Sequence, residues 1–497
     1  MWQLNLPDLE IDWKKLTDVL TYDPQQPMIF SSGLFLWLFL GFSLIYLLLQ
    51  RKTTARLLFV SLFSYYFYYK SSGFYFFLLG IVTVSDFLLA RWMYRTETSW
   101  KRKLIVCCSL CINLGLLCYF KYTNFFYEML APLWHGTYHP LDIFLPVGIS
   151  FFTFQSLSYT IDVYRKDLKP LSNLLDYVFY VSFFPQLVAG PIVRARDFIP
   201  QIRQPLYVSP EMFGQGVFFI VSGLFKKAVI SDYISVNFVE RIFDNPGLYS
   251  GLENLFGVYG YALQIYCDFS GYSDMAIGLG RMLGFHFPEN FNYPYISASI
   301  TEFWRRWHMS LGSWFRDYLY IPLGGSRKGK ARQLLNILIV WLATGLWHGA
   351  AWTFVLWGLW FAVLLLLEKL ALLPVLEKHR VLGHVYTLFF VTLGFVLFDA
   401  DSAAQAVSRI SAMLGAGGLP LSSTQAVYYL KSYGPLLVLG ILCATPLPKM
   451  IVAKLRKSKG AATALDVLEP LCVLIPLLLG TAFLVDGSFN PFLYFRF

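Results

Sequence analysis

Long apolar runs recur along this chain from residue 30 to residue 486, and they constrain its fold more than any other feature. A helix of about 20 apolar residues can cross a bilayer, because it satisfies its own backbone hydrogen bonds in lipid. The 497 residues are 57% hydrophobic and only 14% charged, and no stretch has the composition of a separate soluble domain. The sequence therefore predicts an all-α polytopic membrane protein.

The apolar runs predict about 11–13 transmembrane or re-entrant helices. Most runs have a length that suits one crossing, whereas 255–285 is too long for a single one. The predicted segments are 30–49, 57–69, 74–90, 104–120, 141–163, 177–193, 213–231, 255–285, 333–347, 350–368, 384–398, 433–447 and 466–486.

A polar segment precedes the first apolar run. Residues 1–28 carry Asp8, Glu10, Asp12, Asp18 and Asp23 without an apolar core, so they do not have the basic start and apolar centre of a signal peptide. We expect a polar N-terminal extension over 1–28 and a single integral membrane domain over 29–497.

The net charge of +10 is concentrated in short basic segments. Such loops stay on the cytoplasmic side, so we expect 51–56, 91–103, 325–332 and 449–459 inside and the acidic N-terminus and 121–140 outside. A basic rim also raises the local concentration of anionic ligands such as a coenzyme A thioester or an acidic carrier protein. Positive-inside topology explains most of these residues by itself, and no nucleic-acid partner is indicated.

Residues 287–332 are too polar, and too rich in Pro, Asn and Arg, for a lipid-facing helix. Irregular backbone at membrane depth persists only inside protein or beside a water-filled cavity. We therefore expect a re-entrant or buried element that lines a cavity.

Within this block, a helix is expected over 301–318 with Ser299 or Thr301 as its cap. Three- and four-residue spacing places His308 on one face of that helix and turns Arg305 elsewhere. The expected neighbours of His308 are Trp304, Leu311 and Phe315.

Two histidines in tryptophan-rich segments are the candidate catalytic groups. His308 lies in FWRRWHMSLGSWF (303–315) and His348 in ATGLWHGAAW (343–352). Burial among aromatic rings disfavours the charged imidazolium, and a neutral imidazole is the state that a general base requires. A buried histidine alone is more often a structural hydrogen bonder, but intramembrane ionisable groups are costly and are functional candidates by default. Both are predicted to be catalytic, and the choice of base stays open.

Other side chains are predicted to line or support the same cavity. Asp268 and Asp274 do not share a helical face, so structural hydrogen bonding is favoured for them, with Arg281 as a possible ion-pair partner. Asn290 and Asn292 are expected to orient backbone or substrate. The predicted supporting set is Trp304, Arg305, Trp347, Asp268, Asp274 and Asn292.

Several familiar catalytic patterns are absent from the sequence: a GxSxG nucleophile elbow, a GxxxxGK[ST] phosphate loop and an HExxH zinc helix. Cys107, Cys108 and Cys111 lie close together, but they have no acidic or histidine neighbour and zinc usually takes four ligands. No metal site is therefore predicted. Direct transfer between two bound substrates, assisted by histidine, needs none of this machinery.

These segments together resemble the membrane-bound O-acyltransferase family, and most closely its members that act in alginate O-acetylation. The likeness covers the chain nearly end to end and in order, apart from the 1–28 extension. The segments that carry it are IFSSGLFLWLFL (29–40), NLGLLCYFKYTNFF (113–126), LPVGISFFTFQSLSYTIDVYR (145–165), FFPQLVAGPIVRARDFIPQ (183–201), YCDFSGYSDMAIGLGRMLGF (266–285), the block 291–329, TGLWHGAAWTFVLWG (344–358) and NPFLYFRF (490–497).

The resemblance implies helices around a central tunnel, where an extracytoplasmic funnel and a cytoplasmic tunnel meet near the two histidines. It implies transfer of an acyl group, most simply acetyl, from a cytoplasmic thioester to a hydroxyl, for O-acetylation of an exported polysaccharide such as alginate. Acetyl coenzyme A or an acyl carrier protein would be a substrate, and no permanently bound cofactor is expected.

The resemblance further implies a multi-pass protein of the bacterial cytoplasmic (inner) membrane, with membrane lipid around it. Its partners would be a periplasmic acyltransferase that receives the acyl group, through a serine hydroxyl, and other polysaccharide-secretion subunits. D-alanyl, peptidoglycan or cellulose acyl transfer by the same mechanism stays an alternative. So does a non-catalytic scaffold of polysaccharide export, or a transporter, although a transporter predicts symmetry-related halves and the sequence has no internal repeat.

Overall fold

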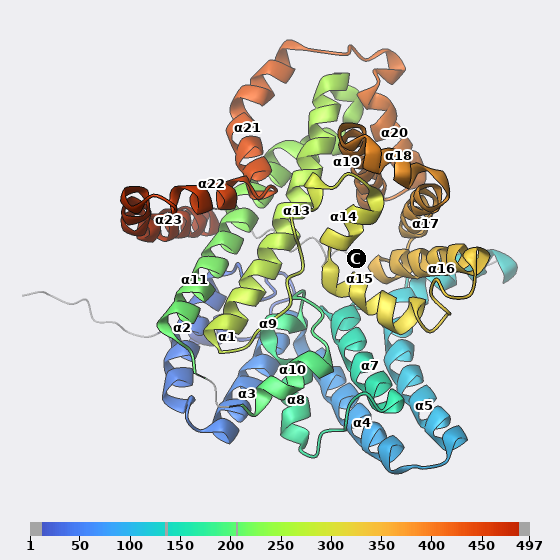
Figure 1. The fold of residues 1–497 in the computed structure, drawn as a ribbon, viewed down its shortest axis with the longest axis vertical. Helices are drawn as coiled ribbons and strands as arrows, with labels where there is room; N and C mark the ends of the chain where they lie inside the picture. The colour runs from blue at the N-terminus through green and yellow to red at the C-terminus, as the bar shows by residue number, and fades with distance from the viewer. Residues whose placement is uncertain (1–11, 135–137, 205–206, 487–497) are drawn as a thin grey trace, which may run out of the picture.

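The computed structural model describes residues 12–134, 138–204 and 207–486, and every regular element in these ranges is helical (Figure 1). Six stretches of these residues are long and apolar enough to cross a membrane. The prediction of an all-α polytopic membrane protein is confirmed. The six stretches are Thr53–Arg95, Ser99–Leu133, Trp352–Lys378, Arg380–Asp399, Thr424–Cys443 and Lys459–Val485.

The N-terminal third of the chain forms α1 to α7, and the remaining helices follow in the order that Figure 1 labels. The bounds of the early helices are α1 Trp13–Leu20, α2 Gly33–Leu49, α3 Thr53–Ser72, α4 Phe76–Arg95, α5 Ser99–Leu117 and α6 Thr123–Leu130. Those of the later helices outside the central core are α10 Ala195–Ile202, α12 Glu240–Asp244, α16 Lys330–His348, α17 Trp352–Leu367, α18 Leu373–Lys378, α19 Arg380–Asp399, α20 Ala403–Met413, α21 Thr424–Cys443, α22 Leu447–Leu455 and α23 Lys459–Asp486.

A single long helix, α13 (Gly251–Met282), runs through the middle of the molecule (Figure 1). A capping box of Ser250 and Glu253 starts it, and its 32 residues span about 48 Å at 1.5 Å per residue. The sequence expectation that 255–285 exceeds one crossing therefore corresponds to one uninterrupted helix that is longer than the roughly 30 Å hydrocarbon core.

Glycines allow α13 to pack directly on α11 (Pro210–Leu224). A Cβ atom at Gly223 would lie 2.3 Å from the Gly271 carbonyl oxygen, and one at Gly278 would lie 2.6 Å from that of Gly216. The two contacts are one heptad apart on both helices. This is the close backbone approach that small residues permit between membrane helices.

The buried centre beside α13 contains two segments that the sequence predicted as full crossings. The run 141–163 becomes helical only from Ile149, as α7 (Ile149–Arg165), and nearly all of that helix is buried. The run 177–193 is not one helix: α8 (Leu174–Ser182) and α9 (Phe184–Leu187) lead into irregular, buried backbone that contains Gly190 and Pro191.

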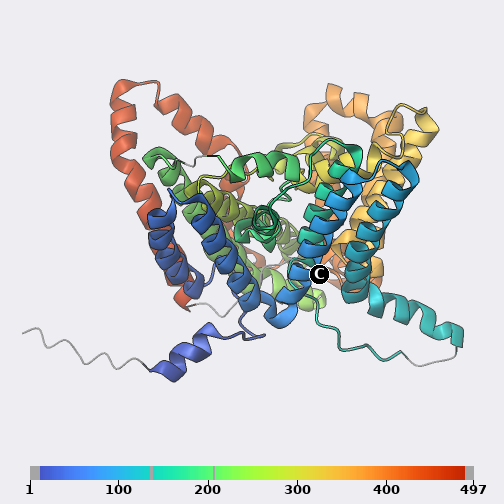
Figure 2. The same cartoon turned by 90° about the horizontal axis from the view of Figure 1, so that it is seen from below.

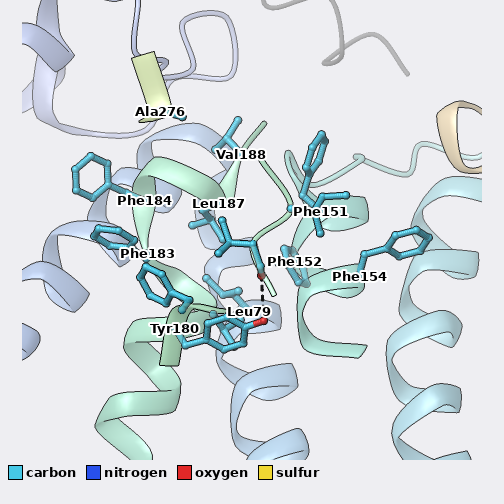
Figure 3. Packing of buried hydrophobic residues seen from close by; sticks show 14 of the residues in the cluster. Leu79, Phe151, Phe152, Phe154, Tyr180, Phe183, Phe184, Leu187, Val188 and Ala276 are labelled. Carbon is cyan, nitrogen blue, oxygen red and sulfur yellow. Dashed lines mark hydrogen bonds between the residues drawn. The ribbon is translucent and has the colours of Figure 1, made fainter. Parts of the chain in front are cut away.

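Aromatic side chains fill the space around this irregular segment (Figure 3). The hydroxyl group of Tyr180 donates to the carbonyl oxygen of Val193 at 3.2 Å, which satisfies one of the buried backbone groups. Phe183 and Phe184 pack on one side of the segment, and Phe151 of α7 lies on the other. The irregular backbone is therefore enclosed by protein, as membrane depth requires.

The polar block 287–332 forms short helical pieces, which agrees with the prediction that it does not make a lipid-facing helix. The single helix expected over 301–318 is wrong. Ser299 does cap α14 (Ile300–Arg306), but the chain breaks before α15 (Met309–Phe315) and a π-helical turn, Arg316–Tyr320. The break occurs because the Met309 amide donates to the Asn290 carbonyl oxygen at 2.9 Å instead of to the preceding turn.

Figure 2 shows α1 and α6 beyond the same end of the bundle, with the α4–α5 connection at the opposite end. Lys70 of α3 holds the C-terminal end of α1 by donating to the carbonyl oxygens of Val19, at 2.9 Å, and Thr21. The part of the 1–28 extension that the structure describes is thus anchored to the helical domain. Residues 1–11 of the extension and NPFLYFRF (490–497) lie outside the described residues.

Candidate active site

His308 occupies the break between α14 and α15, where its backbone is left-handed (φ 46°, ψ 53°). Non-glycine residues rarely adopt this conformation, which costs on the order of 1–3 kcal/mol and is concentrated at functional sites. The residue is only 2% exposed. The fold therefore uses an unfavourable backbone conformation to point this histidine into the protein.

The rings around His308 come from distant parts of the chain. Its ring centroid lies 4.7 Å from that of Phe269 in α13, 5.9 Å from that of Trp347 and 6.4 Å from that of Phe151. The expected neighbours on a continuous helix pack elsewhere, because the helix breaks at His308. Trp304 packs on Trp341, Trp357 and Phe361, and Phe315 packs on Phe154 and Trp314.

Asn290 makes the polar contact to His308. Its Oδ1 atom lies 3.0 Å from His308 Nδ1, 3.2 Å from the Ser310 amide nitrogen and 2.9 Å from Ser310 Oγ. Its Nδ2 atom donates to Ser273 Oγ of α13 at 3.1 Å. The sequence named Asn290 as an orienting residue, and the structure shows that it contacts the candidate catalytic histidine directly.

His348 is the last residue of α16, as the sequence predicts, and it is 4% exposed. Its ring packs against Trp347, Trp357 and Phe398, with centroid separations of 5.0, 4.9 and 5.3 Å. Trp347 thus contacts both histidines. The predicted supporting role of Trp347 has this geometric basis.

Two glycines near His348 are required by close packing. A Cβ atom at Gly345 would lie 2.3 Å from the Phe354 carbonyl oxygen, so α17 approaches the backbone of α16 directly. Gly349 has an extended backbone (φ −162°) that any residue adopts. A Cβ atom there would lie 2.0 Å from the Phe354 ring, so this glycine provides space and not conformational freedom.

Lys121, which the sequence analysis missed, fixes the end of α16. Its Nζ atom donates to the carbonyl oxygens of Trp347 at 2.7 Å and His348 at 2.9 Å. The final carbonyls of a helix have no partner within the helix, so an outside donor is needed when they are buried. The signal was visible in the sequence as a lone lysine within an apolar run, CYFKYTNFF (118–126).

A small cavity reaches His348. It offers about 40 Å³ for the centres of water-sized molecules, which is enough for more than one water. Its lining residues include one charged side chain, that of Lys121. They are Lys121, Leu145, Pro146, Val147, Gly148, Ile149, Ser150, Phe151, Val188, Trp347 and His348. His308 is outside this set but contacts two members of it, Phe151 and Trp347.

The predicted carboxylates serve as ion-pair partners of lysines. Asp268 lies 2.8 Å from Lys227 Nζ, and Asp274 pairs with Lys226. Arg281, suggested as their partner, instead donates to Gln215 Oε1 at 2.8 Å. These aspartate–lysine pairs could not be predicted from the sequence, because the lysines belong to the π-helical continuation of α11, and only the folded structure packs this segment against α13.

The remaining predicted residues lie away from the histidines. Asn292 is exposed, and its backbone exchanges hydrogen bonds with Arg306. Arg305 is also exposed. Trp304 packs against Trp357, which in turn packs against His348. Among the residues that the structure describes, no group of three or more His, Cys, Asp or Glu side chains is arranged to hold a metal ion.

An arginine cluster lies around Asp317 in the π-helical turn after α15. Arg194 and Arg316 pair with its carboxylate, Arg196 lies 3.3 Å from the same group, and Arg165 donates to its backbone carbonyl at 3.2 Å. Burial raises the pKa of Asp317, but the hydrogen bonds from Arg316 and Arg194 more than offset burial and lower it to about 2. Three guanidinium groups thus contact the Asp317 carboxylate, and a fourth contacts its backbone. A second carboxylate, Asp197, lies 3.9 Å from Arg196, so the four arginines outnumber the carboxylates they contact.

Comparison with known proteins bears directly on this site. The model of the family described as MBOAT, membrane-bound O-acyltransferase, matches residues 116–392, a range that contains both histidines and Lys121. A probable alginate O-acetylase of Azotobacter vinelandii is 36% identical over 95% of this chain and 100% of its own length. A probable alginate O-acetylase of Pseudomonas aeruginosa is 39% identical over 80% of this chain and 76% of its own. A peptidoglycan O-acetyltransferase of Helicobacter pylori is 33% identical over 83% and 86%.

Proposed function

Because the chain belongs to the membrane-bound O-acyltransferase family and is an O-acyltransferase, we propose that it supplies acetyl groups for the O-acetylation of an exported, alginate-like polysaccharide. The observation that carries this proposal is the pair of buried histidines that both contact Trp347, one of them at the wall of a cavity. The polysaccharide is proposed from the likeness to alginate O-acetylases over most of the chain.

The proposed reaction moves an acetyl group from a thioester to a hydroxyl. The hydroxyl oxygen attacks the thioester carbonyl carbon, the new C–O bond forms and the C–S bond breaks. One of the two histidines takes the hydroxyl proton and returns it to the leaving thiolate, so the products are an ester and a free thiol. A general base contributes typically ~10²–10⁴-fold, and holding both substrates in one site contributes further.

The proposed donor is a cytoplasmic thioester, either acetyl coenzyme A or an acyl carrier protein. Both are anionic, and the arginine cluster around Asp317 supports this choice because its excess positive charge attracts anions. The donor is a substrate in this scheme, and no permanently bound cofactor takes part.

The proposed orientation places the N-terminus outside the bacterial inner membrane. The basic segment between α4 and α5 would then lie in the cytoplasm, and α1 and α6 would lie outside, since they share the opposite end of the bundle (Figure 2). The acetyl group would leave on this outer side. We propose a serine hydroxyl of a periplasmic acyltransferase as its acceptor, with other secretion subunits as further partners.

The test is the amount of ester-linked acetate on secreted polysaccharide from cells that carry His308→Ala or His348→Ala, with membrane levels of each variant compared with the unsubstituted protein. Loss of acetate at normal protein levels is expected. Unchanged acetate in both variants would overturn the catalytic assignment and favour a scaffold of polysaccharide export.

A second polymer has a specific observation in its favour, the likeness to a peptidoglycan O-acetyltransferase over 83% of the chain. The same cells therefore need acetate measured on isolated peptidoglycan as well. If acetate is lost only from peptidoglycan, the final acceptor is the cell wall and not an exported polysaccharide.

A further inference from the structure

Asn290 offers only one kind of atom to His308, and the surrounding hydrogen bonds identify it. The Ser310 backbone N–H can only donate, and it points to Asn290 Oδ1 at 3.2 Å. The other amide atom, Nδ2, lies 3.1 Å from Ser273 Oγ. The atom that faces the Ser310 amide must therefore be the carboxamide oxygen, because an NH₂ group there would oppose the Ser310 N–H, which can only donate.

This acceptor dictates the protonation of the histidine ring. His308 Nδ1 lies 3.0 Å from the same oxygen, so Nδ1 must carry a hydrogen. In a neutral imidazole the other nitrogen, Nε2, then has the lone pair. Nε2 is buried and receives no hydrogen bond from the residues that the structure describes. The basic nitrogen of His308 is thus kept apart from the protein's own donors.

We propose that Asn290 is a positioning residue that holds His308 as its Nδ1–H tautomer, so that Nε2 is the nitrogen that accepts the hydrogen of the acceptor hydroxyl. This inference rests on the proposed function. When Nε2 takes the proton, Nδ1–H remains bonded to the Asn290 oxygen and the imidazolium charge faces a neutral acceptor. When Nε2 returns the proton to the leaving thiolate, the ring regains its starting tautomer.

The position of Asn290 suits this role because it is itself fixed on several sides. It is 1% exposed, its backbone carbonyl accepts from the Met309 amide, and its side chain connects α13 at Ser273 to α15 at Ser310. The carboxamide therefore cannot rotate away from His308 without breaking other buried hydrogen bonds, each of which is costly to leave unmade.

The first test reads the tautomer directly and does not depend on activity. Full-length protein labelled with ¹⁵N-histidine is studied by solid-state NMR in lipid, and His308→Gln assigns the His308 signals. A protonated Nδ1 and an unprotonated Nε2 are expected. A protonated Nε2 in the unsubstituted protein would overturn the proposal, whatever the polymer data show.

Two substitutions separate positioning from a merely structural role. Asn290→Leu removes the acceptor, and we expect acetate on the polysaccharide to fall on the order of tenfold or more, with a loss of the Nδ1–H tautomer. Asn290→Asp keeps an acceptor in place, so the tautomer and most acetylation should persist. Its carboxylate should also move the NMR titration of His308 to higher pH, because a nearby negative charge stabilises imidazolium.

Ser313→Ala is the matched control. It removes a hydrogen bond within α15, from Ser313 Oγ to the Ser310 carbonyl oxygen, without touching Asn290 or His308. Full acetylation is expected. If Asn290→Leu keeps the Nδ1–H tautomer, or Asn290→Asp leaves the His308 titration unmoved, the positioning role is wrong. If the tautomer is as proposed but His308→Ala acetylates normally, the proposed catalytic function fails while the contact stands.

Discussion

The ammonium group of Lys121 donates to the backbone carbonyl oxygen of His348 at 2.9 Å, so a lysine within the second long apolar stretch fixes the helix end that carries a candidate catalytic histidine. The same ammonium group holds the carbonyl of Trp347. The position of the histidine ring therefore depends on a contact between residues that are 227 positions apart.

Lys121→Met tests this contact. The substitution keeps a long side chain but leaves two buried carbonyls without their donor, and each such loss costs about 1–3 kcal/mol. We expect a lower thermal unfolding midpoint in detergent and a loss of ester-linked acetate in cells. Lys103→Met, at an exposed position of α5, is the control and should change neither quantity. Full activity and stability in Lys121→Met would show that the lysine does not support the site.

A pair of helical glycines tests the packing of α17 behind His348. Gly345→Ala brings a Cβ atom to 2.3 Å from the Phe354 carbonyl oxygen, and backbone cannot move aside as a side chain can. Overpacking of this kind costs about 1–3 kcal/mol, so the unfolding midpoint and acetylation should both fall. Gly115→Ala in α5 meets nothing within 4 Å and should be neutral or stabilising, because alanine favours a helix by up to about 1 kcal/mol. Equal behaviour of the two variants would contradict the close approach.

The histidines could be found from sequence because their signal is local. An ionisable group in a tryptophan-rich apolar segment is unusual wherever the chain folds, so His308 and His348 are visible without knowledge of tertiary contacts. Their catalytic role stays a prediction. The class of membrane protein could also be predicted from the sequence, because it depends on composition and on the length of apolar runs.

The surroundings of His308 could not be predicted from the sequence in the same way. The local sequence pattern supports a helix over 301–318, but it contains no sign that the Met309 amide donates to the Asn290 carbonyl oxygen. That one tertiary hydrogen bond breaks the helix and replaces Trp304 by Phe269, Phe151 and Trp347 around the ring. The lysine partners of Asp268 and Asp274 likewise required the packing of α11 on α13.

The arginine cluster predicts how stability depends on pH. The pKa of Asp317 is about 2 in the folded protein, below its usual value of 3.8, because Arg316 and Arg194 outweigh the effect of burial. A lowered folded-state pKa stabilises the fold above pH 3.8 and loses that contribution as pH falls toward 2. Asp317→Asn should therefore unfold at a lower temperature than the unsubstituted protein at pH 7, and the difference should shrink between about pH 4 and pH 2.

Thermal unfolding of detergent-solubilised protein over this pH range makes the measurement. Asp466→Asn is the control, since this carboxylate pairs with Arg456 on the surface, where both side chains are largely exposed and such pairs contribute about 0–1 kcal/mol. A difference between Asp317→Asn and the unsubstituted protein that stays constant down to pH 2 would show that the arginines do not act through the charge of Asp317.

Trp347 contacts both histidines, and its substitution tests whether acetylation depends on how these histidines are positioned as well as on their presence. Trp347→Ala removes the ring that contacts both imidazoles and leaves a cavity, which costs about 3–5 kcal/mol for a buried tryptophan. Trp347→Phe keeps a smaller aromatic ring and should retain more stability. We expect acetylation to fall strongly in Trp347→Ala and partially in Trp347→Phe, at membrane levels checked for each, because His308 and His348 lose their common wall. Trp37→Ala, which changes an exposed side chain of α2, should acetylate normally. If Trp347→Ala accumulates and acetylates as well as Trp37→Ala, the two histidines do not depend on the ring that contacts both of them, and they would have to be treated as separate sites.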